Sequence, residues 1–246
     1  ATLVEGPAGD DWMVYHGYEN GFWTLGRQCL LDPVEWTPDG WFRARGGDLS
    51  RPLEKPAGGR PGPHGLALSD AFAGPRLGLQ WSFADPGPNE AARVRFDDGL
   101  VLSARGDSPK ESSPLTFVAP DVAYQVEVEV EAPADGSAGV LLFYDRRLYC
   151  GLSFDARAFV THQYGDERGR PANPNGRRMW LRLTNDRHII TFHTSPDGRA
   201  WTKFDRQMEV SGYHHNVRGG FMALRPGLFA AGRGEARFRR LAYRAL

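Results

Sequence analysis

A strict two-residue alternation is the feature that most constrains the fold of this chain. From Tyr124 to Glu131, valine occupies positions 126, 128 and 130, and glutamate occupies 127, 129 and 131. Successive side chains of a β-strand point to opposite faces of its sheet. The pattern therefore predicts a strand whose valines face a core and whose glutamates face water. The glutamates also suggest a metal or catalytic cluster, but a solvated sheet face explains them more simply.

Short polar turns between apolar runs predict that antiparallel hairpins follow one another along the chain. The signals are 140–144 and 148–154 around Asp145-Arg146-Arg147, 180–184 and 189–194 around Asn185-Asp186, and Ser195-Pro196-Asp197-Gly198 before 201–204. No segment shows sustained helical periodicity with caps. The expected fold class is all-β, with an antiparallel β-sandwich as its main part.

Composition supports this fold class and excludes some functions. The 246 residues include 30 glycines and 18 prolines, which suits a chain with many turns. Basic and acidic residues number 30 each, so the chain lacks the basic excess of a nucleic-acid-binding protein. No apolar run is long enough for a membrane span, and no signal peptide is visible. We expect a soluble bacterial protein, with cytoplasmic and secreted locations both open.

Three zones divide the chain. Residues 1–43 hold four of the seven tryptophans, at positions 12, 23, 36 and 41. Residues 44–66 contain six glycines and four prolines, which predicts a linker. Residues 67–246 carry the strand signals and are long enough for one complete domain, whereas 43 residues are too few for an independent core.

The common catalytic motifs are missing from the chain. There is no Gly-x-Ser-x-Gly, no phosphate-binding glycine loop, no Cys-x-x-Cys and no dinucleotide fingerprint. His188 and His193 lie five apart on a predicted strand and would point to opposite faces. Cys29 and Cys150 either form a bridge or, more simply, stay as two buried thiols.

The first zone contains a recognisable order of short motifs. Met13-Val14-Tyr15-His16, Gly26-Arg27-Gln28, Pro33-Val34-Glu35-Trp36 and Asp39-Gly40-Trp41 resemble the last blade of family 43 glycoside hydrolases. These enzymes are β-xylosidases and α-L-arabinofuranosidases with a five-bladed β-propeller. Residues 67–246 resemble the concanavalin-like β-sandwich that follows the propeller in the β-xylosidase branch. The matching pieces there are Leu79-Gln80-Trp81, 138–144, 180–183, 195–202 and 219–227.

The resemblance implies a C-terminal portion of a glycosidase that acts on xylo- or arabino-oligosaccharides. The family's catalytic base, pKa-setting aspartate and general acid lie on earlier blades, so no catalytic residue is assigned in this chain. Its partners would be the remaining blades, from the same parent chain or from a second one, and the oligosaccharide substrate. No nucleic acid or membrane partner is expected. The alternative is a non-catalytic carbohydrate-binding or structural sandwich.

Four residues are candidates for substrate binding. The resemblance assigns Arg27 to the sugar pocket, where a planar guanidinium offers several donors to neighbouring hydroxyls. Tyr213, His214 and His215 lie in a loop that gathers an aromatic ring and two imidazoles, and we expect it near Arg27 in the complete enzyme. The plainer interpretation is that the two histidines bond to the backbone. No cofactor is certain; a calcium ion near Asp70 and Glu235 is a hypothesis taken from sandwiches of this kind.

The sandwich prediction includes a set of buried side chains. They are Val126, Val128, Val130, Leu141, Phe143, Trp180, Leu181 or Leu183, and Phe221. Tyr164 and Tyr213 are candidates for exposed aromatic rings that stack on sugars, although ordinary edge packing would also explain them.

Overall fold

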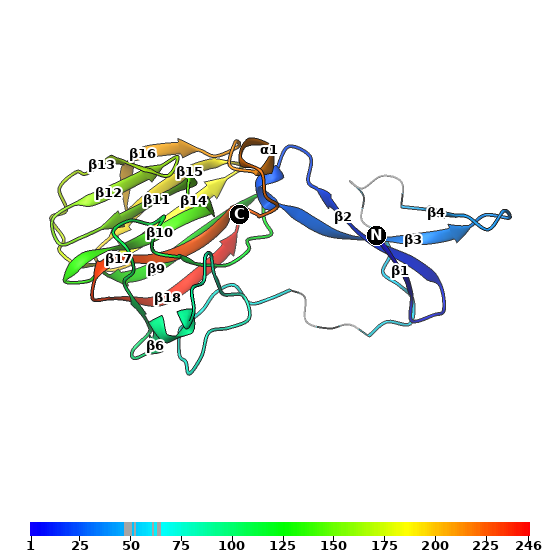
Figure 1. Cartoon of the computed structure of the whole chain (residues 1–246), viewed down its shortest axis with the longest axis horizontal. Coiled ribbons are helices and arrows are strands. Elements are labelled where there is room, and N and C mark those ends of the chain that lie inside the picture. Colours follow the sequence, from blue (N-terminus) through cyan, green and yellow to red (C-terminus); the bar gives the residue numbers. More distant parts are fainter. Residues whose placement is uncertain (47–50, 52, 61, 63–64) are drawn as a thin grey trace. The chain divides into compact units, whose positions relative to one another are not determined.

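The computed structural model describes residues 1–46, 51, 53–60, 62 and 65–246. Within these ranges the chain forms one four-stranded and two seven-stranded antiparallel sheets. It divides into two compact units, which are residues 1–21 with 27–65, and residues 22–26 with 66–246. In Figure 1 the blue part of the chain carries the four-stranded sheet, and the green to red part carries the two larger sheets.

The four-stranded sheet is a meander in the first unit. Its order is β1 (Thr2–Glu5), β2 (Asp11–Tyr18), β3 (Arg27–Trp36) and β4 (Phe42–Ala44). The motifs that resemble a propeller blade lie on these strands: Met13-Val14-Tyr15-His16 is part of β2, and Pro33-Val34-Glu35-Trp36 ends β3. Part of the predicted linker 44–66 lies outside the described residues.

The second unit is a sandwich of two sheets. The first sandwich sheet has the order β13 (Asp166–Gly169), β12 (Phe159–Gln163), β11 (Leu148–Phe154), β10 (Asp135–Asp145), β17 (Arg225–Arg233), β8 (Leu115–Thr116) and β5 (Ser82–Phe83). The second sandwich sheet has the order β16 (Thr202–Glu209), β15 (Ile189–Ser195), β14 (Arg178–Asp186), β9 (Ala123–Glu131), β18 (Glu235–Ala245), β7 (Leu100–Ser103) and β6 (Val94–Phe96).

Helical structure is minor in the described part of the chain. It comprises two 3₁₀ turns, η1 (Trp23–Leu25) and η2 (Glu90–Arg93), and the single-turn helix α1 (His215–Arg218). None of these helices is long or apolar enough to cross a membrane. The predicted all-β fold class is therefore confirmed.

Strand β9 has the alternation that its sequence predicted. Val126, Val128 and Val130 are buried and lie in register with Leu183, Leu181 and Met179 of β14. Each such aliphatic side chain contributes about 1.5–3 kcal/mol when it is fully buried. Because the register fixes which residues share a face, the glutamates between these valines all point away from the core.

Two of the predicted core positions are wrong. Trp180 is half-buried on the outer face of the second sheet, because its neighbour Leu181 takes the inward position opposite Val128. Its indole packs on the turn at Gly198, where φ is +73° and a Cβ atom would lie 2.9 Å from the ring. Phe221 is 66% exposed, because it follows α1 in a segment without strand pairing.

Leu141 and Phe143 are buried, but not between the sheets. Their neighbours Leu142 and Tyr144 face the sandwich core. Leu141 and Phe143 instead form a small second cluster on the outer face of the first sheet, together with Tyr149, Phe229 and Ala231. The loop that carries Arg105 and Gly106 reaches this face and bonds to Ala230 and Gly232 of β17.

A buried histidine lies next to this second cluster. His162 of β12 is 6% exposed, and its Nε2 atom lies 3.0 Å from the hydroxyl of Ser153. Its ring packs on Phe229 and Tyr149, at centroid distances of 5.9 and 6.1 Å. Burial lowers the pKa of His162 to about 4, because desolvation disfavours the charged imidazolium.

The lowered pKa of His162 predicts a specific loss of stability in acid. The unfolded chain takes up this proton near pH 6.5, whereas the folded chain resists it until about pH 4. The stabilisation is therefore complete above pH 6.5 and is lost as the pH falls, with a cost of about 3 kcal/mol by pH 4. Urea unfolding of the wild type and of His162→Gln across this range should show a smaller decline in the variant. His16→Gln, which changes an exposed histidine, should decline like the wild type, and parallel curves for all three proteins would contradict the assignment.

Candidate functional site

Arg27 begins β3 and lies on the exposed side of the four-stranded sheet. It pairs in register with Tyr18, the last residue of β2. Its Nε atom donates to the Tyr18 hydroxyl over 3.1 Å, and the guanidinium carbon lies 5.8 Å from the centre of that ring. The tyrosine therefore orients the side chain that the sequence analysis assigned to sugar binding.

The connection between β2 and β3 belongs to the sandwich unit. Residues 22–26 form η1 and end at Gly26, where φ is +72° and a Cβ atom would lie 3.1 Å from the Ala223 backbone. The Leu224 amide donates to the Thr24 carbonyl over 2.7 Å. Only a residue without a side chain can lie this close to the Ala223 backbone at a positive φ. Gly26 therefore fixes the path of the chain immediately before Arg27.

Two histidines of the sandwich contact this connecting segment. The Thr24 hydroxyl lies 3.0 Å from Nε2 of His188, and the Phe22 ring packs on the same imidazole at a centroid distance of 5.0 Å. The Trp23 ring meets His214 edge to face, also at 5.0 Å. We call the group formed by Phe22, Trp23, Thr24, His188, His214 and His215 the histidine cluster.

The surroundings of the two contacting histidines favour the neutral imidazole. Burial lowers the pKa of His188, and burial together with the neighbouring histidines lowers the pKa of His214. Nδ1 of His214 accepts a hydrogen bond from the Asn216 amide over 3.2 Å and so caps α1. A neutral imidazole both donates and accepts, which suits contact with hydroxyl groups without adding charge.

The predicted site residues have different surroundings. His214 and His215 are adjacent in space, with ring centroids 5.7 Å apart, and the backbone bond expected for the pair is present at His214. Tyr213, in contrast, is fully buried in the sandwich core. Its hydroxyl accepts a hydrogen bond from the Tyr164 amide over 3.0 Å. Its ring therefore presents no surface to a sugar, and Tyr213 positions Tyr164 instead.

The sequence analysis missed His188 as a member of the cluster because it placed the turn two residues too early. Strand β14 continues through Asn185 and Asp186, and the turn lies at Arg187 and His188, whose φ values are +47° and +79°. The His188 amide donates to the Asn185 side chain over 2.9 Å. That asparagine, a residue type that bonds to the backbone a few positions on, was the available signal.

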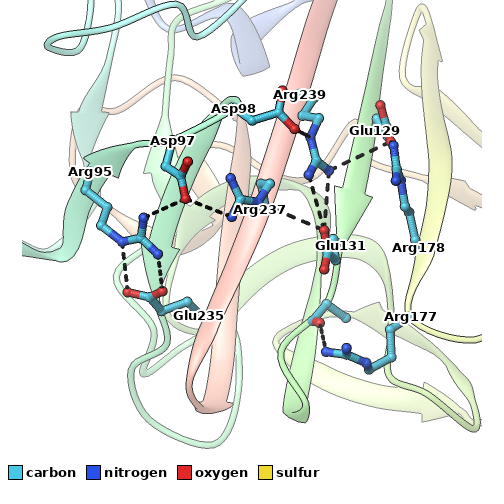
Figure 2. Close-up of polar contacts among 11 residues, drawn as sticks. Arg95, Asp97, Asp98, Glu129, Glu131, Arg177, Arg178, Glu235, Arg237 and Arg239 are labelled. Carbon is cyan, nitrogen blue, oxygen red and sulfur yellow. Dashed lines mark hydrogen bonds and ion pairs between the residues drawn. The ribbon is translucent and has the colours of Figure 1, made fainter.

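The acidic side chains of β9 are paired with arginines. Glu127 accepts from Arg182 over 2.7 Å, and Glu129, only 5% exposed, accepts from Arg178 over 2.6 Å. Glu131 lies 3.3 Å from Arg239. Figure 2 shows that these contacts continue across β18 to the strands at the edge. The outer face of the second sheet is therefore an ion-pair network rather than a freely solvated surface.

The ion-pair network extends to Asp97 and Asp98, which follow β6, and to Glu235, which begins β18. Arg237 and Arg95 both contact Asp97, at 3.2 and 3.1 Å, and Arg95 contacts Glu235 at 2.7 Å. Arg239 also contacts Asp98 at 2.9 Å. Among the described residues, no three His, Cys, Asp or Glu side chains come together as metal ligands.

The residues named for a calcium ion do not fit one. Both carboxylate oxygens of Asp70 accept hydrogen bonds from the protein. The donors are the Phe72 backbone amide, the Gln80 side-chain amide and the Trp81 indole. Glu235 is engaged by Arg95. Cys29 is exposed and Cys150 is buried, and the two do not form a disulfide. The expectation of two buried thiols is thus wrong for Cys29, which lies on the outward side of β3.

The fold defines a class of protein, namely a concanavalin-like antiparallel β-sandwich joined to a small four-stranded sheet. Residues 69–244 match the family model of the beta xylosidase C-terminal concanavalin A-like domain, and the chain belongs to this family. Residues 1–42 match glycosyl hydrolases family 43, so the resemblance stated from the sequence is confirmed. No curated protein matches the chain.

Several solved structures share the fold of this chain. A xylan beta-1,4-xylosidase from Bacillus halodurans C-125 has a TM-score of 0.82 and 19% identity, over 98% of this chain and 52% of its own. The protein BlXynB from Bacillus licheniformis has a TM-score of 0.82 and 22% identity, over 100% and 53%. A Bacteroides ovatus protein, GH43B of a xyloglucan locus, has a TM-score of 0.78 and 19% identity, over 99% and 53%. This chain therefore spans about half the length of these structures and corresponds to their C-terminal part.

The ion-pair network predicts that replacing Arg239 lowers the free energy of unfolding and that a second substitution recovers part of the loss. Replacing Arg239 with methionine removes a 13%-exposed guanidinium from beside the buried Glu129 and should cost about 2–4 kcal/mol of unfolding free energy. Adding Glu129→Gln to that variant should recover part of the loss, because it removes a buried charge that has lost one of its two arginine partners and keeps only Arg178. Urea denaturation of the two variants measures both effects.

Arg244→Met is the matched control for this experiment. Arg244 is an exposed arginine of the same strand that bonds to Gln125 rather than to a carboxylate. Its replacement should change stability by less than about 0.5 kcal/mol. Equal losses for Arg239→Met and Arg244→Met would show that the network does not stabilise the sheet.

Proposed function

We propose that this chain is the C-terminal portion of a glycosidase that hydrolyses xylo- or arabino-oligosaccharides. In this proposal its sandwich supports the propeller and borders the active site. Family membership supports the hydrolase assignment. Structures of the same fold include a protein titled xylan beta-1,4-xylosidase and an engineered family 43 glycoside hydrolase whose title gives it both endo-xylanase and exo-arabinofuranosidase activity. The rest of the propeller, in the same parent chain or in a second one, would be its partner.

One observation carries the role proposed for the sandwich. The segment that precedes Arg27 in the chain packs on His188 and His214 through Phe22, Trp23 and Thr24. Gly26 is followed directly by Arg27 in the chain, so in this proposal the sandwich restrains the segment that leads into the sugar-binding strand. The imidazoles of the histidine cluster would bond to sugar hydroxyls, which donate and accept like the imidazole itself.

The chemistry proposed for Arg27 is transition-state stabilisation by fixed donors. Glycoside hydrolysis passes through a distorted sugar ring, and hydrogen bonds to its hydroxyls strengthen in the transition state. The catalytic acid and base require two carboxylates across the scissile bond. We assign neither to this chain and place both in the remaining blades.

Substitutions in the full-length protein should separate these roles. Arg27→Ala should lower kcat/KM by about 100-fold, which is about 2.7 kcal/mol of transition-state stabilisation. His214→Ala and His215→Ala should raise KM with a smaller loss in kcat, as expected when uniform binding is removed. Initial rates on aryl β-xylosides and aryl α-L-arabinofuranosides provide the measurement.

Arg45→Ala serves as the control for Arg27→Ala. Arg45 is an exposed arginine of the first unit, whose side chain is 64% exposed and lies 3.8 Å from Glu35. It should leave kcat/KM within about twofold of the parent, or roughly 0.4 kcal/mol. If Arg27→Ala, His214→Ala and His215→Ala all did the same, the active-site assignment would be abandoned.

A further inference from the structure

A polar groove crosses the outer face of the first sandwich sheet. It consists of three hollows of about 540, 190 and 500 Å³, and the middle one shares lining residues with each of the others. The shared residues are Asp107, Ser137, Arg170, Lys110, Gly165 and Asp166. The loop 107–111 lies along one side of the groove, and β13 with Arg170 lies along the other.

The groove exists because side chains on this part of the sheet are small. In register across β10, β11 and β12, Gly139 lies opposite Ser153, and Gly151 lies opposite His162. The large side chains of the same face, Phe143, Tyr149 and Phe229, gather in the second cluster instead. The surface of the sheet is therefore recessed between that cluster and the edge strand β13.

One buried polar group at the middle hollow is not satisfied by the protein. The Ser108 hydroxyl has no hydrogen-bond partner in the described part of the chain. His162 lines the same hollow, is 6% exposed, and bonds to Ser153 through its Nε2 atom. Buried polar groups normally find partners, so the unsatisfied hydroxyl points to a bound ligand.

The walls carry both signs of charge in nearly equal number. The acidic side chains are those of Asp107, Glu111, Asp135, Asp155, Asp166 and Glu167, and the basic ones are those of Lys110, Arg146, Arg147, Arg157 and Arg170. Arg170 is held by Glu167 at 2.8 Å and by Asp155 at 3.2 Å. A balanced groove has no net attraction for an anion or a cation, but it offers many fixed donors and acceptors to a neutral ligand with hydroxyl groups.

An aromatic ring stands at one end of the groove. Tyr164 lines the third hollow and is 51% exposed, and its ring lies 5.3 Å from that of Tyr213. Its φ is +53°, a left-handed conformation that is unusual for a bulky residue. The bond from its amide to the Tyr213 hydroxyl holds it there. The ring presents an apolar face beside polar groups, which is the arrangement that binds a sugar ring.

We propose that this groove is a binding site for a neutral oligosaccharide. Tyr164 stacks on one sugar ring, Arg170 and the wall carboxylates bond to hydroxyls, and the unpartnered Ser108 hydroxyl bonds to another hydroxyl in the middle hollow. The site uses none of the residues assigned to the proposed glycosidase. Only the choice of a xylan-type probe rests on that proposed function.

The test is an amide NMR titration of the 246-residue chain with xylohexaose, and with cellohexaose in a parallel series. Saturable chemical-shift changes should appear at residues 107–111 and 162–170. The expected Kd is about 1 mM, which is a binding free energy of about −4 kcal/mol. Tyr164→Asn removes the ring and keeps a residue that favours a positive φ. Arg170→Gln removes the charge from a half-exposed position. Each should weaken binding at least about fivefold, which is about 1 kcal/mol.

Arg187→Gln is the matched control for these variants. Arg187 is an exposed arginine that pairs with Asp186 at 2.8 Å, outside the groove, and its replacement should leave the Kd unchanged. Absence of saturable shifts with both sugars would overturn the proposal, and so would binding that survives both groove substitutions. Because catalysis is not measured, failure here leaves the glycosidase proposal standing, and loss of the glycosidase proposal would not remove binding in the groove.

Discussion

The sandwich depends on the pairing of β9 with its two neighbours. On the inner side, the valines of this strand meet Leu181, Leu183 and Met179 of β14, and Val130 also meets Phe238 of β18. On the outer side, the same registers bring Arg182 opposite Glu127 and Arg239 opposite Glu129. A slip of one residue would place carboxylates in the core and valines in water, so the two faces enforce a single register.

The outer faces of the two sandwich sheets carry different side chains. On the second sheet, the glutamates that follow from the alternation are neutralised by arginines of adjacent strands, which leaves a compensated surface (Figure 2). On the first sheet, glycine and serine replace large side chains next to a buried imidazole, and the surface is hollowed. The first arrangement stabilises the sheet, and the second offers donors and acceptors to a ligand.

In the proposed function, the histidine cluster gives the sandwich a role beyond supporting the propeller. Burial lowers the pKa of His188 and of His214, and the neutral imidazole packs against aromatic rings and a threonine hydroxyl without the cost of burying a charge. They contact a segment that continues directly into Arg27. The proposed function rests on this continuity: the sandwich would restrain the segment that leads into the strand proposed to bind sugar.

The sequence by itself determined the all-β class, the alternation of β9 and most hairpins, because period-two patterns and turn residues are local properties. Through the resemblance it also named Arg27 as a candidate for sugar binding. Tertiary structure decided the rest. Phe221 is exposed and Tyr213 is buried, although their local patterns suggest the opposite, because burial depends on which strands happen to cover a loop. His188, His214 and Phe22 come together only when segments more than 160 residues apart are packed side by side. The groove depends on small residues from three strands lying in one register, and no single segment of the chain contains that information.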